Sequence, residues 1–330
     1  MGAEFHAGLP EKLEALLRFR PSPQQPVVVH LPRDLNLADA PARGRILDFA
    51  TRFKGRVHGM VIHDHTDMVR SPEQYLQAAL EMEAWLEPLQ GSPWLFVEYA
   101  AGLDPDVFLR FFESTRALTR ISACIDIGHV GTRQAQVAYE QRHPGQDICA
   151  LKSRPAELPA AMAEIDQAVA TSLPTVLKVV EGIRQLGKPF HFHLHDGHPL
   201  STFSPFGVAD HLSFRSEIPI GFEHRGRRAV PLMFGPDGLK QIVRRALGPD
   251  GTASVTFTLE IHPTFERLPL GDGCGVEEPA EAGTPNLSCA GWGEDAALFS
   301  HWVDKTHAEE MNHWVNILTD NRRLVKELLT

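Results

Sequence analysis

Acidic residues and histidines stand at the ends of short apolar runs in this chain of 330 residues. Nitrogen and oxygen ligands of this kind, without a thiolate, favour a divalent metal site. Four of these residues form the core set of candidate ligands: Glu98, Asp126, His193 and Glu260. Three carboxylates and one imidazole suit Mn²⁺, Co²⁺, Mg²⁺, Fe²⁺ or Zn²⁺, and we expect one such ion per chain.

This ligand set predicts a particular chemistry. A divalent ion can hold two oxygens of a hydroxy-carbonyl compound and make the adjacent C–H acidic. A ligating glutamate keeps a free oxygen that can act as a base. Glu98 and Glu260, on opposite sides of the substrate, would suit 1,2-proton transfer or epimerisation. A small carbohydrate-like substrate is therefore expected.

Other polar residues have two interpretations. His30 and His63 end apolar runs and are either further metal ligands or the polar lining of a sugar pocket. Arg215 and Arg225 either meet a phosphate or carboxylate of the substrate or belong to a solvated loop. The full set of additional candidates for metal or substrate binding is His30, His63, His65, His129, His195, Asp196, Asp210, His211, Arg215 and Arg225.

Strand-like and helix-like segments alternate along the chain, which favours a parallel β/α architecture. The predicted fold class is α/β, a (β/α)₈ TIM barrel built as a single domain over residues 1–330. In such a barrel the C-terminal ends of all strands meet at one face, so the candidate residues would converge there. Strands are expected at 2–7, 26–30, 57–63, 94–98, 121–126, 189–194, 218–222 and 252–260.

Long insertions are expected after strands five and six. They form loop excursions at about 130–175 and 197–234, and we interpret both as candidate lids. The first excursion begins with a polar loop at 131–153, and a helical run follows at 156–186. A C-terminal helical segment is expected at about 295–330. The other predicted helices lie at 10–18, 40–53, 72–89 and 105–118, and a further one follows Gly235-Pro236-Asp237-Gly238 and ends at about 247.

Composition limits the class of protein. Hydrophobic residues make up 43% of the chain and the formal net charge is −10, as in an ordinary soluble protein. This charge gives no support for a nucleic-acid surface, although a local basic groove on an acidic protein is not excluded. No apolar run approaches the roughly 20 residues that span a bilayer. The N-terminal residues lack a signal-peptide pattern, so a cytoplasmic location without membrane contact is expected.

Several short motifs carry a resemblance. Asp126-Ile127-Gly128-His129 resembles the Asp-x-x-His element of the xylose isomerase-like TIM-barrel superfamily, which includes sugar isomerases and epimerases and endonuclease IV. His193-Leu194-His195-Asp196 is similar to its strand-six segment, and Leu259-Glu260-Ile261 to its strand-eight glutamate. Glu98 matches its strand-four glutamate. The resemblance covers most of the barrel.

The resemblance implies roles for these residues. Glu98, Asp126, His193 and Glu260 would be the metal ligands, and Glu98 and Glu260 would share the acid–base work. His129 would contact the substrate or a second metal ion. The implied function is a metal-dependent isomerase or epimerase acting on a small sugar or related hydroxy-carbonyl compound. Superfamily members often associate through their outer helices, so a homo-oligomer is an open alternative.

Two other functions remain as alternatives. Endonuclease IV has metal-binding histidines at places similar to His30 and His63, and it binds three zinc ions. The first alternative is therefore a multinuclear hydrolase or phosphodiesterase of that type, or a multinuclear iron oxidase, with up to three ions per chain. Asp210-His211 is a counterpart of that family's Asp-x-His, with altered spacing. The second alternative is a barrel that binds a metabolite without catalysis.

Overall fold

The structure of the protein is a computed structural model. It describes residues 3–20, 22, 25–154, 156–201, 211–249, 251, 253–261 and 307–329. The chain forms two compact units. Unit 1 comprises Met1–Arg133, Pro174–Leu194 and Gln241–Thr258, and unit 2 comprises Gln134–Leu173, His195–Lys240 and Leu259–Thr330. Each unit has its own sheet and its own set of polar side chains.

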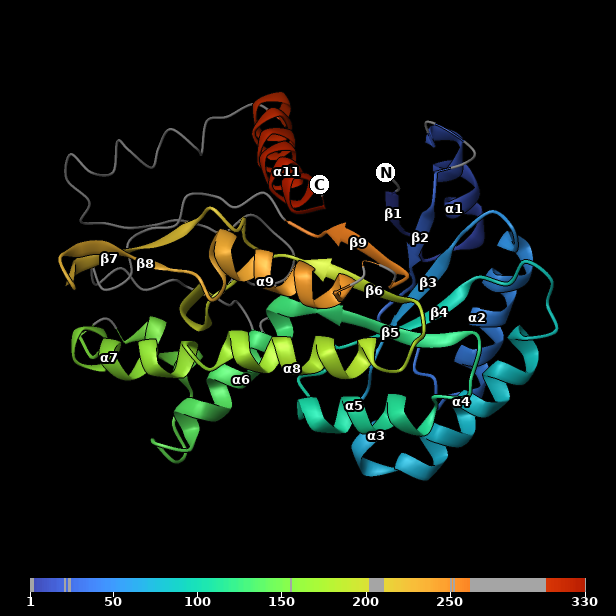
Figure 1. Ribbon diagram of the computed structural model, residues 1–330, viewed down its shortest axis with the longest axis horizontal. Coiled ribbons are helices and arrows are strands. Elements are labelled where there is room, and N and C mark those ends of the chain that lie inside the picture. Colours follow the sequence, from blue (N-terminus) through green and yellow to red (C-terminus); the bar gives the residue numbers. More distant parts are fainter. Residues whose placement is uncertain are drawn as a thin grey trace. The chain divides into compact units, whose positions relative to one another are not determined.

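The main sheet has the order β1-β2-β3-β4-β5-β6-β9, and neighbouring strands from β1 to β6 are all parallel (Figure 1). Seven of the eight predicted barrel strands lie in this sheet, with shifts of a few residues at their ends. The strands are β1 (Ala3–His6), β2 (Val27–His30), β3 (Gly59–His63), β4 (Trp94–Glu98), β5 (Ile121–Asp126), β6 (Phe190–Leu194) and β9 (Val255–Leu259).

Side chains of distant strands meet inside this sheet. Glu4 of β1 contacts His191 and His193 of β6, although four strands lie between β1 and β6 in the sheet order. The sheet is therefore curled until it is nearly closed, like a barrel. The described residues give an α/β fold compatible with a TIM-like barrel, with seven strands in this sheet rather than the predicted eight.

The interior of the sheet is layered because alternate residues of a strand face the same side. One buried apolar layer contains Val28, Val61, Phe96 and Cys124. Two residues further along each of these strands, the interior positions are polar. They are His30, His63, Glu98 and Asp126. The apolar layer thus forms a floor beneath the predicted site.

Helices follow most of these strands and cover the sheet from outside (Figure 1). Helix α2 (Ala40–Phe53) illustrates why they form. Asp39 caps it by accepting a hydrogen bond from the N–H of Ala42, and Ile46 and Phe49 are buried on one face. The other helices before α6 are α1 (Pro10–Leu16), α3 (Asp67–Arg70), α4 (Pro72–Leu86) and α5 (Pro105–Ser114).

The segment predicted as a polar loop at 131–153 is mostly helical, so that prediction is wrong. Helix α6 (Ile127–Glu140) begins directly after β5, and a 3₁₀ helix covers Ile148–Ser153. Asp126 accepts a hydrogen bond from the N–H of His129, which starts the helix in the manner of an N-cap residue. The helical run at 156–186 is confirmed as α7 (Leu158–Val169) and α8 (Ser172–Arg184).

The predicted seventh barrel strand at 218–222 is also corrected. It lies in β7 (Glu217–His224), which pairs antiparallel with β8 (Arg227–Pro231) in a separate two-stranded sheet of unit 2. Positive φ angles of 50° at Arg225 and 75° at Gly226 reverse the chain in a tight hairpin. The predicted insertion at 197–234 therefore contains this hairpin.

The remaining helices agree with the sequence. Helix α9 (Gly235–Leu247) ends where predicted but begins four residues earlier, within the segment 235–238 that was expected to precede it, and α11 (His307–Leu329) confirms the described part of the C-terminal helical segment. In unit 2, Asn321 of α11 donates to Ser213 and accepts from the N–H of Phe214. Among the helices that the structure describes, none is long and apolar enough to cross a membrane.

The close packing of the main sheet yields a stability prediction. A Cβ atom on Gly59 of β3 would lie 2.4 Å from the ring of Phe96, whereas one on Gly44 of α2 would have no neighbour within 4 Å. Gly59→Ala should therefore lower the free energy of unfolding by about 1–3 kcal/mol through overpacking. Gly44→Ala, the matched control, should raise it by about 0.5–1 kcal/mol through helix propensity. Denaturant unfolding measures both, and equal effects would contradict this account.

Candidate metal centre

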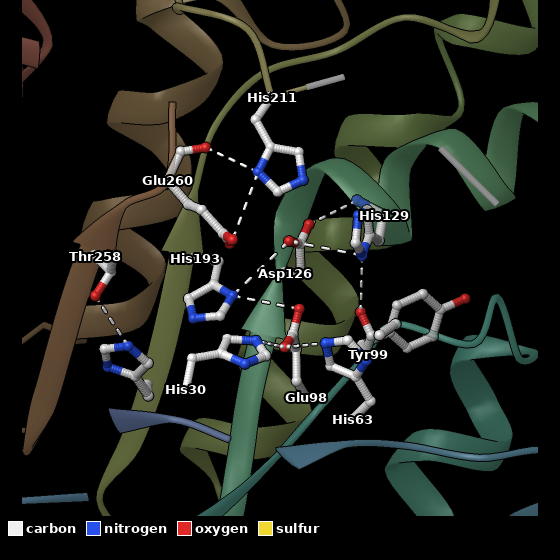
Figure 2. A network of polar contacts seen from close by, with 12 residues as sticks. His30, His63, Glu98, Tyr99, Asp126, His129, His193, His211, Thr258 and Glu260 are labelled. Carbon is white, nitrogen blue, oxygen red and sulfur yellow. Dashed lines mark hydrogen bonds and ion pairs between the residues drawn. The ribbon is translucent and has the colours of Figure 1, made fainter. Parts of the chain in front are cut away.

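Glu98, the last residue of β4, lies at the centre of the polar cluster in unit 1. Its side chain is only 2% exposed. Its Oε2 lies 2.9 Å from Nε2 of His30 and 3.4 Å from Nε2 of His63. Figure 2 shows both imidazoles pointing at the carboxylate from the ends of β2 and β3. His30 and His63, expected to be either metal ligands or the lining of a sugar pocket, thus lie directly against a predicted metal ligand.

The second oxygen of Glu98 faces a different group. Nδ1 of His193 lies 3.3 Å from Glu98 Oε1 and 4.0 Å from Oδ2 of Asp126 (Figure 2). Register pairs Asp126 with His193 on neighbouring strands β5 and β6. The structure therefore brings together three of the four predicted core ligands, and one ligand atom from each lies within 4.8 Å of the others.

The Asp-x-x-His element places His129 beside this group. The first turn of α6 brings the backbone N–H of His129 to 2.8 Å from Asp126 Oδ1. Its Nδ1 lies 3.6 Å from Asp126 Oδ2 and 3.4 Å from the carbonyl oxygen of Tyr99. The spacing of three residues thus serves two purposes, since it caps the helix and puts an imidazole next to the carboxylate.

Sequence reasoning missed Glu4, a buried carboxylate on β1. Its Oε2 lies 3.1 Å from Nε2 of His191, and its Oε1 lies 3.0 Å from Nε2 of His193. A signal was present, because Glu4 and His6 alternate along a short strand and so share one face. His6 stacks on His30 with ring centroids 4.7 Å apart.

Burial and pairing shift the pKa values of these groups. Burial alone would raise the pKa of Glu98, but the adjacent His193 and His30 lower it well below its usual range. Burial alone would lower the pKa of His30, yet the hydrogen bond and charge of Glu98 raise it to about 9. Burial lowers the pKa of His63 to about 4. Glu98 is thus held as an anion, and His30 supplies the compensating positive charge.

Cys124 lies close to the same histidines but differs in chemistry. Its thiol is fully buried on β5, two residues before Asp126. Burial raises its pKa, so the thiol stays protonated. A protonated thiol is a poor metal ligand. The other groups of this cluster that could hold a metal ion offer imidazole and carboxylate donors, the types expected from the sequence.

Unit 2 holds its own group of predicted residues. The rings of His195 and His211 stack with centroids 3.9 Å apart. Nδ1 of His211 donates to the carbonyl oxygen of Glu260 at 2.9 Å and lies 3.8 Å from its Oε1 (Figure 2). Glu260 belongs to unit 2. Its predicted place as fourth ligand beside Glu98 stays a prediction.

The last predicted residues take other positions. Asp196 is fully buried and accepts hydrogen bonds from the backbone N–H groups that precede and begin α9. Arg225 is 69% exposed at the hairpin turn and pairs with Asp166 at 3.0 Å. Arg215 is exposed, and His65 lies two residues beyond β3. Asp210 lies outside the described residues.

Comparison with models of known protein families gives no match, and comparison with curated protein sequences gives none either. The resemblance to the xylose isomerase-like superfamily thus stays a prediction from short motifs.

The cluster of unit 1 predicts that divalent ions stabilise the folded chain, because the ligands come together only on folding. At a free ion concentration 100 times the dissociation constant, the gain in unfolding free energy should be about 2.7 kcal/mol. Asp126→Asn should lose most of this gain. The control Asp48→Asn makes the same change on the exposed face of α2 and should retain it. Thermal unfolding of chelator-treated protein with and without Mn²⁺, Zn²⁺ or Co²⁺ measures the effect. If none of these ions raises the unfolding temperature, the cluster does not bind a metal ion.

Proposed function

We propose that the chain is a metal-dependent hydrolase of phosphoesters, with Glu98 shared between two divalent ions. The observation that carries this proposal is the division of the Glu98 carboxylate, whose two oxygens face separate ligand groups. A carboxylate that bridges two ions uses one oxygen for each. In two-metal hydrolases the ions stabilise both the attacking and the leaving oxygen of a displacement at phosphorus.

The first ion would be held by His30, His63 and Glu98 Oε2. Their ligand atoms lie within 4.8 Å of one another. Nδ1 of His30 donates a hydrogen bond to the carbonyl oxygen of Leu31 at 3.0 Å. This contact directs Nε2 of His30 towards the carboxylate. A backbone carbonyl on the far nitrogen is a common means of fixing a ligating histidine.

The second ion would be held by Glu98 Oε1, Asp126 and His193. A mixed set of carboxylate and imidazole donors suits Mn²⁺, Fe²⁺, Co²⁺ and Zn²⁺, and it suits less well the soft ions that prefer thiolate ligands. Oδ1 of Asp126 accepts a hydrogen bond from the N–H of His129, which restrains rotation of the carboxylate away from the site. His129 remains the predicted contact for substrate at the edge of this group.

The second candidate is the metal-dependent isomerase or epimerase. It is favoured by the meeting of Glu98, Asp126 and His193, which are three of the four ligands that it requires. It gives no metal-binding role to His30 and His63, which lie against the same carboxylate. We therefore place the two-ion hydrolase first.

Metal stoichiometry tests this choice. Mass spectrometry of protein purified without chelator should find about two ions per chain, as a two-metal site requires. His30→Ala and His63→Ala should each lower the content towards one ion, because they remove ligands of the first ion only. His143→Ala removes a histidine of unit 2 that contacts Glu164 and Tyr139 and should leave the content unchanged. A single ion that survives both substitutions would favour the isomerase.

Activity provides the second part of that test. The wild-type protein loaded with Mn²⁺, Zn²⁺ or Fe²⁺ should release p-nitrophenol from bis(p-nitrophenyl) phosphate, and His63→Ala should not. Interconversion of aldoses and ketoses without phosphoester hydrolysis would reject the hydrolase in favour of the second candidate.

A further inference from the structure

Glu4 is a carboxylate of β1 that contacts two histidines of β6. Its side chain is only 3% exposed, and each of its oxygens meets one imidazole. Oε1 lies 3.0 Å from Nε2 of His193, while Oε2 lies 3.1 Å from Nε2 of His191. The opposite nitrogen of His193, Nδ1, is the one that faces Glu98 and Asp126. His193 is thus held between a carboxylate behind it and the proposed ligands in front.

We propose that Glu4 is a positioning residue that fixes His193 with Nε2 protonated and Nδ1 directed at the metal ion, and so sets the affinity of the second ion site. A carboxylate only accepts hydrogen bonds, so Nε2 must donate to it. A ring nitrogen that donates leaves the other one to ligate, and such carboxylate–histidine pairs orient metal ligands in many proteins. The inference rests on the proposed function only in assigning an ion to His193.

The other oxygen of Glu4 is restrained in turn. Nδ1 of His191 lies 2.7 Å from the hydroxyl of Thr256 on β9, and Nε2 lies 3.1 Å from the hydroxyl of Thr258. His191 is therefore tied to a neighbouring strand and keeps Glu4 from swinging away from His193. The pairing differs from a simple buried ion pair because both ends of the carboxylate are fixed by separate imidazoles.

Glu4→Gln tests this role with little change in shape. The amide can accept from one imidazole, but its NH₂ group then meets the other N–H, donor against donor. We expect the affinity of the second ion to fall about 10–100-fold, as when other partners of ligating histidines are removed. The ion at His30 and His63 should bind as before. Glu4→Asp keeps a carboxylate and should restore part of the lost affinity.

The matched control is Glu14→Gln, which makes the same change in an exposed ion pair with Arg56. Chelator competition gives the affinities, and the visible spectrum of Co²⁺-loaded protein reports the ligand field of the His193 site. Wild-type affinity and an unchanged cobalt spectrum in Glu4→Gln would overturn the positioning role. A loss of thermal stability without any change in affinity would show that Glu4 is only structural, and would also overturn it.

A readout without metal separates this inference from the proposed function. Long-range ¹H–¹⁵N NMR of the metal-free protein, assigned with His193→Gln, reports which ring nitrogens of His193 carry protons. We expect Nε2 of His193 to be protonated in the wild type and to lose this fixed state in Glu4→Gln. An unprotonated Nε2 in the wild type would overturn the inference whatever the metal content. A protonated Nε2 in a chain that binds no ion would support the fixed orientation and reject the proposed function.

Discussion

The rest of the site depends on carboxylates buried inside a parallel sheet. Glu4, Glu98 and Asp126 are shielded from water, and a buried charge is costly unless it is paired. The sheet meets this constraint with imidazoles, since His30, His63 and His193 are all placed against these acids. Each imidazole is thereby oriented by a carboxylate, and each carboxylate by an imidazole.

The strand geometry explains how this polar layer is built. Alternate residues of a strand share one face, so a single shift of two residues leads from the apolar floor to the polar layer. Val61 and His63 show the change on β3, and Phe96 and Glu98 show it on β4. Val28, Val61, Phe96 and Cys124 of the floor are buried, and electrostatic interactions are stronger in such a low-dielectric environment than in water. The curl of the sheet then allows β1 to reach β6.

Part of this arrangement could be read from the sequence. Buried parallel strands are short, almost continuous apolar runs, so their positions and their polar ends were predictable. Helix α6 was missed because Gly128 and Gly131 and its polar residues hide the apolar face. The hairpin was missed because its turn depends on a positive φ at Arg225, an unusual residue for that conformation.

The role of Glu4 could not be predicted from the sequence alone, since its partners lie on β6, with four strands between β1 and β6 in the sheet order. Its contact with His193 joins residues 189 positions apart. Replacing a buried ionic network by apolar residues of similar volume is often neutral or stabilising, so stability alone gives little reason for Glu4, His193 and Glu98 to be present together. Burial of ligand-type groups at such a cost is instead typical of functional sites. The proposal of two ions follows the same reasoning, because it gives the buried His30 and His63 a metal-binding role at the Glu98 carboxylate. With a single ion on His193, they would act instead as charge partners of Glu98 or as the lining of a substrate pocket.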